Sequence, residues 1–410
     1  MKKRNLRLGL LFGILIGWPF HAEAQAPCGS DMTPLFGLTT ESVEDLDGRL
    51  LPALEKIREK CIPTLRVVFQ PADNSGAEEE LLNEYAEKLE RIRGKGATPT
   101  YAYVMGLLVD SQAFYKYDNA RMRERARKYA EALGDYVDIW EAGNEVNGDW
   151  VGWNEEEKDE KGEKKYEKEG DGSLKRMRES VGKRIKIVYD EVRKVYGKKG
   201  KTPRFALNLY FNDDNIESRK KSDGSYDGNN CLNMDLKKCR GDCLHDYEMF
   251  TWADKYLKPR KNKLKFDYVL FSFYKDDCSA VVTDAQLWAR TFAKLSADFT
   301  VEGVSPKVGF GEVGPQCYCS VDGDGKPKKD GNLRRVDPCC RPEQPSYVRD
   351  YYQTLHRQIK AAINDIPGRK PDYVGGFFYW YFYQDATEKK PESEQVLNAL
   401  VESAETWRKQ

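Results

Sequence analysis

Two glutamates that lie far apart in the sequence have surroundings that suit chemistry better than stability. Glu145 ends the segment Trp140-Glu-Ala-Gly-Asn-Glu145, and Glu312 ends the segment Val308-Gly-Phe-Gly-Glu312. A carboxylate that closes a buried strand costs free energy, because burial disfavours its charged form unless partners compensate. Cleavage of a glycosidic bond requires two carboxyl groups at one mouth, so this pair is the first candidate for a catalytic site.

The segments that must position these acids alternate between two kinds. Short β-type runs, mostly apolar on both faces, recur between amphipathic stretches with helical periodicity, which predicts a parallel sheet of βα units. The predicted strands are residues 34–38, 64–69, 100–107, 136–143, 204–210, 266–273, 307–311 and 373–380. These eight units predict an α/β fold, a (β/α)8 TIM barrel with enlarged βα loops, as a single domain over residues 28–408.

The helical segments carry start and stop signals. Asp118 is placed to cap a helix, and Gly134 to end it. A continuous apolar stripe predicts a long helix over residues 174–196. The charge-dense run 155–171 is most simply a solvated loop between the fourth strand and this helix.

Residues 1–24 have the pattern of an export signal. Basic residues precede an apolar stretch from Leu8 to Phe20, and Ala22-Glu-Ala24 offers a small-residue cleavage site. We therefore expect a secreted or periplasmic protein, free of the membrane once the signal is removed. Loss of the segment changes the net charge from +0 to about −3. This balance argues against nucleic acid as a partner, and we expect a monomer.

The chain has ten cysteines, which predict disulfides in an exported protein because the exterior and the periplasm are oxidising. Cys317, Cys319, Cys339 and Cys340 bracket a loop that follows Glu312, so disulfides are expected to link the βα loops. The pairing cannot be read from sequence. A zinc site at Cys231, Cys239, Cys243 and His245 is the alternative, but their spacing matches no strong zinc pattern, and we expect neither a metal nor an organic cofactor.

In a (β/α)8 barrel the carboxyl ends of all strands share one mouth, so Glu145 and Glu312 are expected to meet there. This arrangement resembles clan A of the retaining glycoside hydrolases, the cellulase-, mannanase- and xylosidase-like superfamily with a barrel fold. In that clan the acid/base follows an asparagine after the fourth strand, and the nucleophile ends the seventh. The resemblance covers the mature chain through the order of its elements, whereas its specific residues are few.

The resemblance implies an exported β-glycosidase that hydrolyses a β-linked poly- or oligosaccharide by double displacement. Glu145 is then the general acid/base and Glu312 the nucleophile, and Asn144 binds the 2-hydroxyl of the sugar. Many members of the clan have proline directly after the acid/base, where this chain has Val146. The departure leaves the subfamily open.

Four further residues take roles from the same resemblance. Arg66 on the second strand holds the nucleophile ionised, and Tyr274 after the sixth strand donates a hydrogen bond to it. Trp380 at the end of the eighth strand is the aromatic floor under the sugar to be cleaved. Trp150 is expected to extend the stacking surface for further sugar units.

Each assignment has a plainer alternative. Arg66 could simply pair with Glu141, which shares the side of Glu145 by period two and should lie deeper in the barrel. Tyr274 and the tryptophans could be packing residues, and the two glutamates a loop acid and a turn brace. A barrel that binds carbohydrate without cutting it, or a structural surface protein, is the alternative for the whole chain.

Overall fold

The computed structural model describes residues 35–72, 74–148, 150–152, 171–211, 248–274, 285–314 and 344–409. Several sequence predictions lie outside these residues, namely the export signal, the loops 155–171 and 321–337, and every cysteine except Cys61. Cys61 is buried between the first helix and the second strand, and it is disulfide-bonded. Disulfides that link the βα loops stay a prediction.

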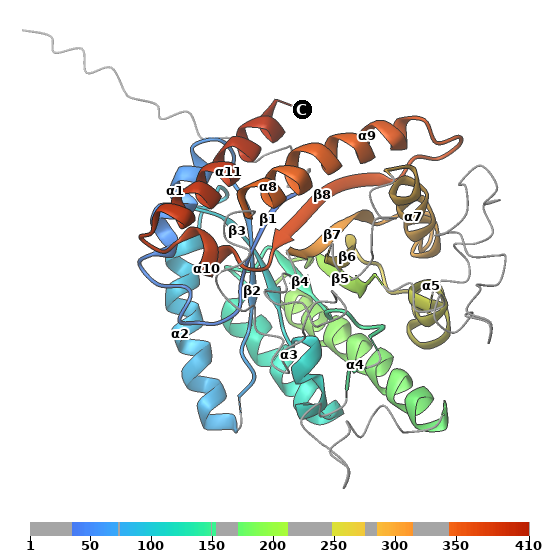
Figure 1. The fold of residues 1–410 in the computed structure, drawn as a ribbon. Coiled ribbons are helices and arrows are strands. Elements are labelled where there is room, and N and C mark those ends of the chain that lie inside the picture. Colours follow the sequence, from blue (N-terminus) through green and yellow to red (C-terminus); the bar gives the residue numbers. More distant parts are fainter. Residues whose placement is uncertain are drawn as a thin grey trace, which may run out of the picture.

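Eight parallel strands close into a barrel in sequence order, because β8 pairs with β1 (Figure 1). The strands are β1 (Leu35–Thr40), β2 (Thr64–Val68), β3 (Tyr103–Leu107), β4 (Ile139–Glu141), β5 (Phe205–Tyr210), β6 (Tyr268–Tyr274), β7 (Lys307–Gly314) and β8 (Asp372–Tyr379). All eight predicted strands and the (β/α)8 TIM barrel are thus confirmed.

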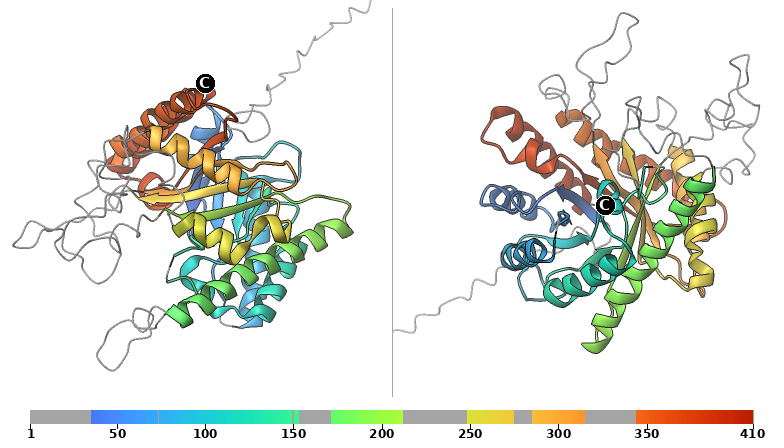
Figure 2. Two further views of the ribbon diagram at one scale, coloured as in Figure 1. Left: turned by 90° about the vertical axis from the view of Figure 1, so that its right-hand side faces the viewer. Right: turned by 90° about the horizontal axis from the view of Figure 1, so that it is seen from below.

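Helices surround the strands on the outside of the barrel (Figure 2). They are α1 (Leu50–Arg58), α2 (Ser75–Arg93), α3 (Asn119–Leu133), α4 (Asp171–Lys198), α5 (Glu248–Trp252), α6 (Pro259–Asn262), α7 (Ala285–Asp298), α8 (Gln344–Arg349), α9 (His356–Asn364), α10 (Phe382–Ala386) and α11 (Pro391–Arg408). Shorter turns are the 3-10 helix η2 (Ser111–Lys116) and the π-helical segments η6 (Ala253–Leu257) and η9 (Asp350–Leu355). The last helix, α11, lies beside α1 and so completes the ring (Figure 1).

The predicted helix signals operate as expected. The Asp118 side chain accepts hydrogen bonds from the backbone N–H groups of Ala120 and Arg121 and caps α3, which ends before Gly134. The predicted long helix is α4, extended at both ends. Within the described ranges, no helix is both long and apolar enough to cross a membrane.

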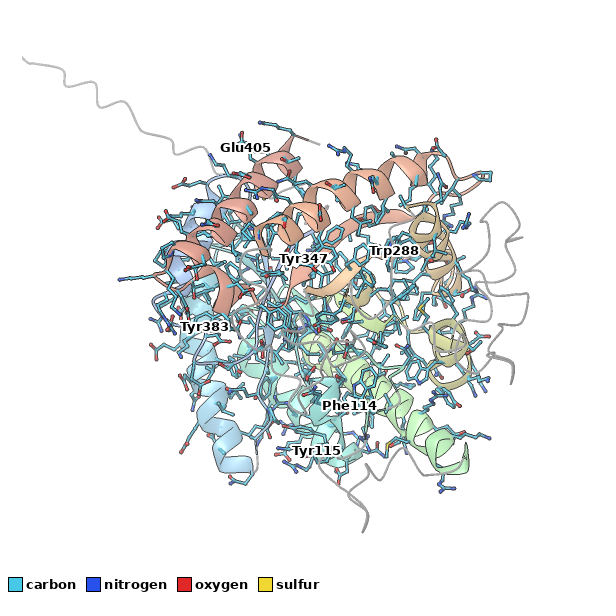
Figure 3. All side chains as sticks on the ribbon, in the orientation of Figure 1. Phe114, Tyr115, Trp288, Tyr347, Tyr383 and Glu405 are labelled. Atoms are coloured by element: carbon cyan, nitrogen blue, oxygen red, sulfur yellow. The ribbon has the colours of Figure 1, made fainter. Side chains whose placement is uncertain are left out.

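Side chains alternate between the two faces of each strand, as strand geometry requires. Outward residues such as Leu65, Val67 and Phe310 join the core between the barrel and the helices. There Phe310 packs edge-on against Trp288 of α7, which is labelled in Figure 3. Inward apolar residues fill the barrel and form a second cluster: Leu35, Met105, Ile139, Ala206, Tyr268, Leu270, Val374 and Phe378. The carboxyl end of the barrel interior is different, because five buried polar residues lie there.

Three strands extend further than the sequence predicts. β1 continues to Thr40, β6 to Tyr274 and β7 to Gly314, whereas the prediction ended β7 at Gly311. Glu312 therefore lies within β7, and Tyr274 is the last residue of β6. Glycines beside a charged residue indicate a turn in sequence, but here the strand continues because residues 312–314 pair with residues 272–274 of β6.

Candidate active site

A polar layer lies inside the barrel at the carboxyl end of its strands. Its members are Thr39, Arg66, Glu141, Asn208 and Ser272, each fully buried. Each follows an outward apolar residue in its strand, so the alternation of strand side chains directs all five into the barrel. Polar side chains in a barrel interior cost free energy unless they bond to one another, which indicates a task at this end.

Glu312 lies at this layer and both its carboxylate oxygens accept hydrogen bonds. Arg66 Nη1 donates to Oε2 at 3.0 Å, and Asn144 Nδ2 donates to the same oxygen at 3.4 Å. The Tyr274 hydroxyl donates to Oε1. The carboxylate is 4% exposed, so these donors replace most of its hydration. The structure thus places Arg66 and Tyr274 beside Glu312, where the sequence analysis expected them, and it adds Asn144, whose expected role toward the sugar stays a prediction.

Arg66 bonds to two carboxylates. Its Nε and Nη2 donate to the two oxygens of Glu141 at 2.6 and 2.9 Å, while Nη1 reaches Glu312. The two interpretations of Arg66, a partner for Glu141 and a partner for the candidate nucleophile, therefore both hold. Glu141 is fully buried below the site, as period two predicts. These three hydrogen bonds fix the orientation of the Arg66 guanidinium and with it the position of Glu312.

Glu145 lies four residues beyond the end of β4, on a loop with unusual backbone. Its φ of 48° is in the left-handed region, which is uncommon for a residue other than glycine. The carboxyl is 9% exposed and accepts a hydrogen bond from Ser111 Oγ at 3.3 Å. The Ser272 hydroxyl lowers the pKa of this carboxyl, although the two groups do not have the geometry of a full hydrogen bond.

The two glutamates belong to one site. Ser272, which acts on Glu145, is the direct neighbour of Glu312 across β6 and β7. Burial and then the charge of Glu312 raise the pKa of Glu145 well above its ordinary value. Burial also raises the pKa of Glu312, to about 7, against the lowering effects of Arg66 and Tyr274. Burial and the charge of Glu312 thus favour the protonated form of Glu145, whereas Arg66 and Tyr274 favour the charged form of Glu312.

Asn144 is held by residues that the sequence analysis missed. Its Nδ2 donates to Asp110 Oδ1 at 2.9 Å, and its Oδ1 accepts from Asn208 Nδ2 at 2.7 Å. Asp110 follows β3, and Asn208 lies inside β5. Both residues could have been found from the sequence. Asn208 is a polar residue between two apolar ones in a strand, and Asp110 follows a strand at the mouth that holds Glu145.

A second missed acid is Glu41, one residue beyond β1. It accepts a hydrogen bond from Gln384 Nε2 at 3.1 Å, and its backbone N–H donates to Asp45. Burial raises the pKa of Glu41 to about 7, and the charges of Asp110 and Arg66 also act on it. Glu41 therefore lies at the same mouth as the two glutamates.

The structure places the two tryptophans differently. Trp380 directly follows β8 and is half-buried, with its ring centroid 5.5 Å from the Arg66 guanidinium carbon. It therefore adjoins the site. Trp150 packs edge-on against Tyr210 at 5.0 Å, and its ring covers Gly148. No contact of Trp150 with either glutamate occurs in the described part of the chain, so its role as a stacking surface stays a prediction.

Val146 has a local reason to differ from proline. Its backbone N–H donates to the carbonyl oxygen of Asn208 at 3.3 Å. Proline has no N–H, so it would remove this bond. The departure from the clan pattern thus follows from how this loop is attached to β5.

No family model matches the chain, and no curated protein matches it. Among solved structures it is similar to β-glucosidases from Thermotoga maritima. The complex with glucoimidazole has 11% sequence identity and a TM-score of 0.48, over 85% of this chain and 88% of that one. The complex with azafagomine has 12% identity and a TM-score of 0.44, over 86% and 89%.

Proposed function

We propose that this chain is a glycoside hydrolase, a retaining β-glycosidase with Glu312 as nucleophile and Glu145 as general acid/base. The observation that supports this most directly is the pairing of the two acids in one buried site. One is surrounded by hydrogen-bond donors and the other has a strongly raised pKa. Environments that push the pKa values of two carboxyls apart are typical of an acid and a nucleophile that act together.

The first step forms a glycosyl ester. Glu312 attacks the anomeric carbon while the glycosidic C–O bond breaks, and Glu145 gives its proton to the departing oxygen. In the second step Glu145 takes a proton from water, whose oxygen attacks the same carbon and releases Glu312. Arg66 and Tyr274 keep Glu312 available as a carboxylate between turnovers, since both lower its pKa.

Retention of configuration requires carboxyl groups roughly 5 to 5.5 Å apart. A short separation is supported by the effect of the Glu312 charge on Glu145 and by Ser272, which adjoins both acids. Trp380 beside Arg66 is the proposed platform for the sugar. Export, a β-linked poly- or oligosaccharide substrate and action as a monomer are part of the same proposal.

The test replaces each acid separately in the full chain. Glu312→Gln and Glu145→Ala should each reduce hydrolysis of aryl β-glycosides by about a thousandfold or more. NMR of the sugar that the wild type releases should show retention of the anomeric configuration. Azide should restore turnover in Glu145→Ala, because a small anion can attack the ester without a base. Glu131→Gln, an exposed change on α3, is the matched control. Binding without turnover in wild type would instead favour a carbohydrate-binding protein.

A further inference from the structure

Two successive residues after β3 contact two successive residues after β4. Asp110 Oδ1 accepts the hydrogen bond from Asn144 Nδ2 at 2.9 Å, and Ser111 Oγ donates to Glu145 Oε2 at 3.3 Å. Ser111 is buried and opens η2, whereas Asp110 is half-buried. Each member of the Asn144–Glu145 pair therefore has its own partner on the neighbouring strand end.

The loop that carries Glu145 needs such support. A φ of 48° is strained in a residue with a Cβ and persists only when surrounding contacts hold it. On the side of β5, Asn208 binds the Asn144 side chain and the Val146 N–H. On the side of β3, the contacts come from Asp110 and Ser111. The loop is thus held from both of its neighbouring strands.

Asp110 also acts through its charge. Its carboxylate raises the pKa of Glu145 and of Glu312. Among the described residues, the other titratable or charged groups with the largest effects on these two acids are Arg66 from β2, Glu141 from β4 and Tyr274 from β6. Arg66 carries a positive charge, whereas Asp110 and Glu141 carry negative charges when ionised. Removal of the Asp110 charge should therefore lower the pKa of both Glu145 and Glu312.

We propose that Asp110 and Ser111 are a positioning pair for the proposed reaction: Asp110 orients Asn144 against Glu312, and Ser111 holds the Glu145 carboxyl in place. Neither is assigned a role as acid, base or nucleophile. This inference rests on the proposed function, because its readouts are those of a glycosidase.

Two substitutions separate the charge of Asp110 from its hydrogen bond. Asp110→Asn keeps an oxygen that can accept from Asn144 but removes the charge, so the pKa values of Glu145 and Glu312 both fall. In the pH profile of kcat/KM, the acid limb and the alkaline limb should then both move to lower pH by about half a unit or more. Asp110→Ala also removes the acceptor, and its optimal rate should fall about tenfold below that of Asp110→Asn. Asp118→Asn, an exposed cap of α3, is the control that leaves both limbs in place.

The contribution of Ser111 is measured with two leaving groups. Ser111→Ala should lower kcat/KM about tenfold for a poorly leaving alkyl or methoxyphenyl glycoside, which needs the proton from Glu145. For a 2,4-dinitrophenyl glycoside, which leaves without a proton, the loss should be less than about twofold. Circular dichroism and thermal unfolding check that each variant is folded.

The outcomes separate this inference from the proposed function. An active wild type for which Asp110→Ala and Asp110→Asn have the same optimal rate overturns the role of Asp110 in orienting Asn144. Equal losses for both leaving groups in Ser111→Ala overturn the role of Ser111. A wild type that cleaves no glycoside overturns the proposed function, and this inference with it.

Discussion

Ser272 and Glu312 face each other across β6 and β7, at the point where the register of the two strands shifts. Phe271 pairs with Phe310, and the next pair is Ser272 with Glu312, so Gly311 is an extra residue in β7. Without this bulge the alternation of side chains would direct Glu312 outward, like Phe310. The bulge therefore turns Glu312 into the barrel, where Arg66 and Tyr274 bind it.

Gly311→Ala should damage both stability and the site. A Cβ at this position would lie 2.5 Å from Asn208 Oδ1, and Asn208 holds Asn144. We expect a loss of about 1–3 kcal/mol in the free energy of unfolding, measured in urea, and a lower kcat/KM. Gly48→Ala, where a Cβ meets nothing within 4 Å, is the control. An active variant as stable as the control would contradict the role of the bulge.

Tyr274→Phe should weaken the nucleophile without unfolding the barrel. The Tyr274 hydroxyl donates to Glu312 and lowers its pKa. Its removal should raise that pKa, so the acid limb of kcat/KM moves to higher pH and the optimal rate falls about tenfold or more. The comparison is Tyr136→Phe, which removes an exposed hydroxyl bonded to Glu90. A limb that stays in place would show that this hydrogen bond does not tune Glu312.

Arg66→Met should destabilise the fold in a pH-dependent way. The change leaves Glu141 buried without its cation, which costs about 3–5 kcal/mol when a buried pair is broken. Arg66 lowers the pKa values of Glu141 and Glu312, so without it both protonate more readily. The stability loss should therefore be larger at pH 8 than at pH 5, as read from urea unfolding at both values. The double variant with Glu141→Gln should recover part of the loss at pH 8.

Glu312→Gln should increase stability at alkaline pH while it removes activity. The pKa of Glu312 is raised from 4.5 to about 7 in the folded protein. A raised carboxyl pKa means that the folded state binds the proton more tightly. Stability from this group is therefore complete below about pH 4.5 and is lost as pH rises through about 7. Glutamine avoids the loss, so the variant should gain on wild type at pH 8 and show little gain at pH 5. A gain that is the same at both pH values would contradict the linkage.

Part of the polar layer could be predicted from the sequence. Strand positions were predictable because short runs that are mostly apolar on both faces are typical of buried parallel strands. Asn208 and Ser272 each stand between two apolar neighbours in such strands, so their inward direction was also open to prediction. Their partners were not, because a hydrogen bond between β4 and β5 depends on register, which a single segment does not determine.

The eight strands, the mouth at their carboxyl ends and the two acids placed there follow from local pattern, since each depends on periodicity or on position after a strand. Three relationships are visible only in the folded barrel: Gly311 is a bulge, Arg66 binds both Glu141 and Glu312, and Asp110 and Ser111 adjoin the Asn144–Glu145 loop. These relationships join residues distant in sequence. The physical reason is that strand register and side-chain packing, which are set by the whole barrel, bring the groups within hydrogen-bond distance.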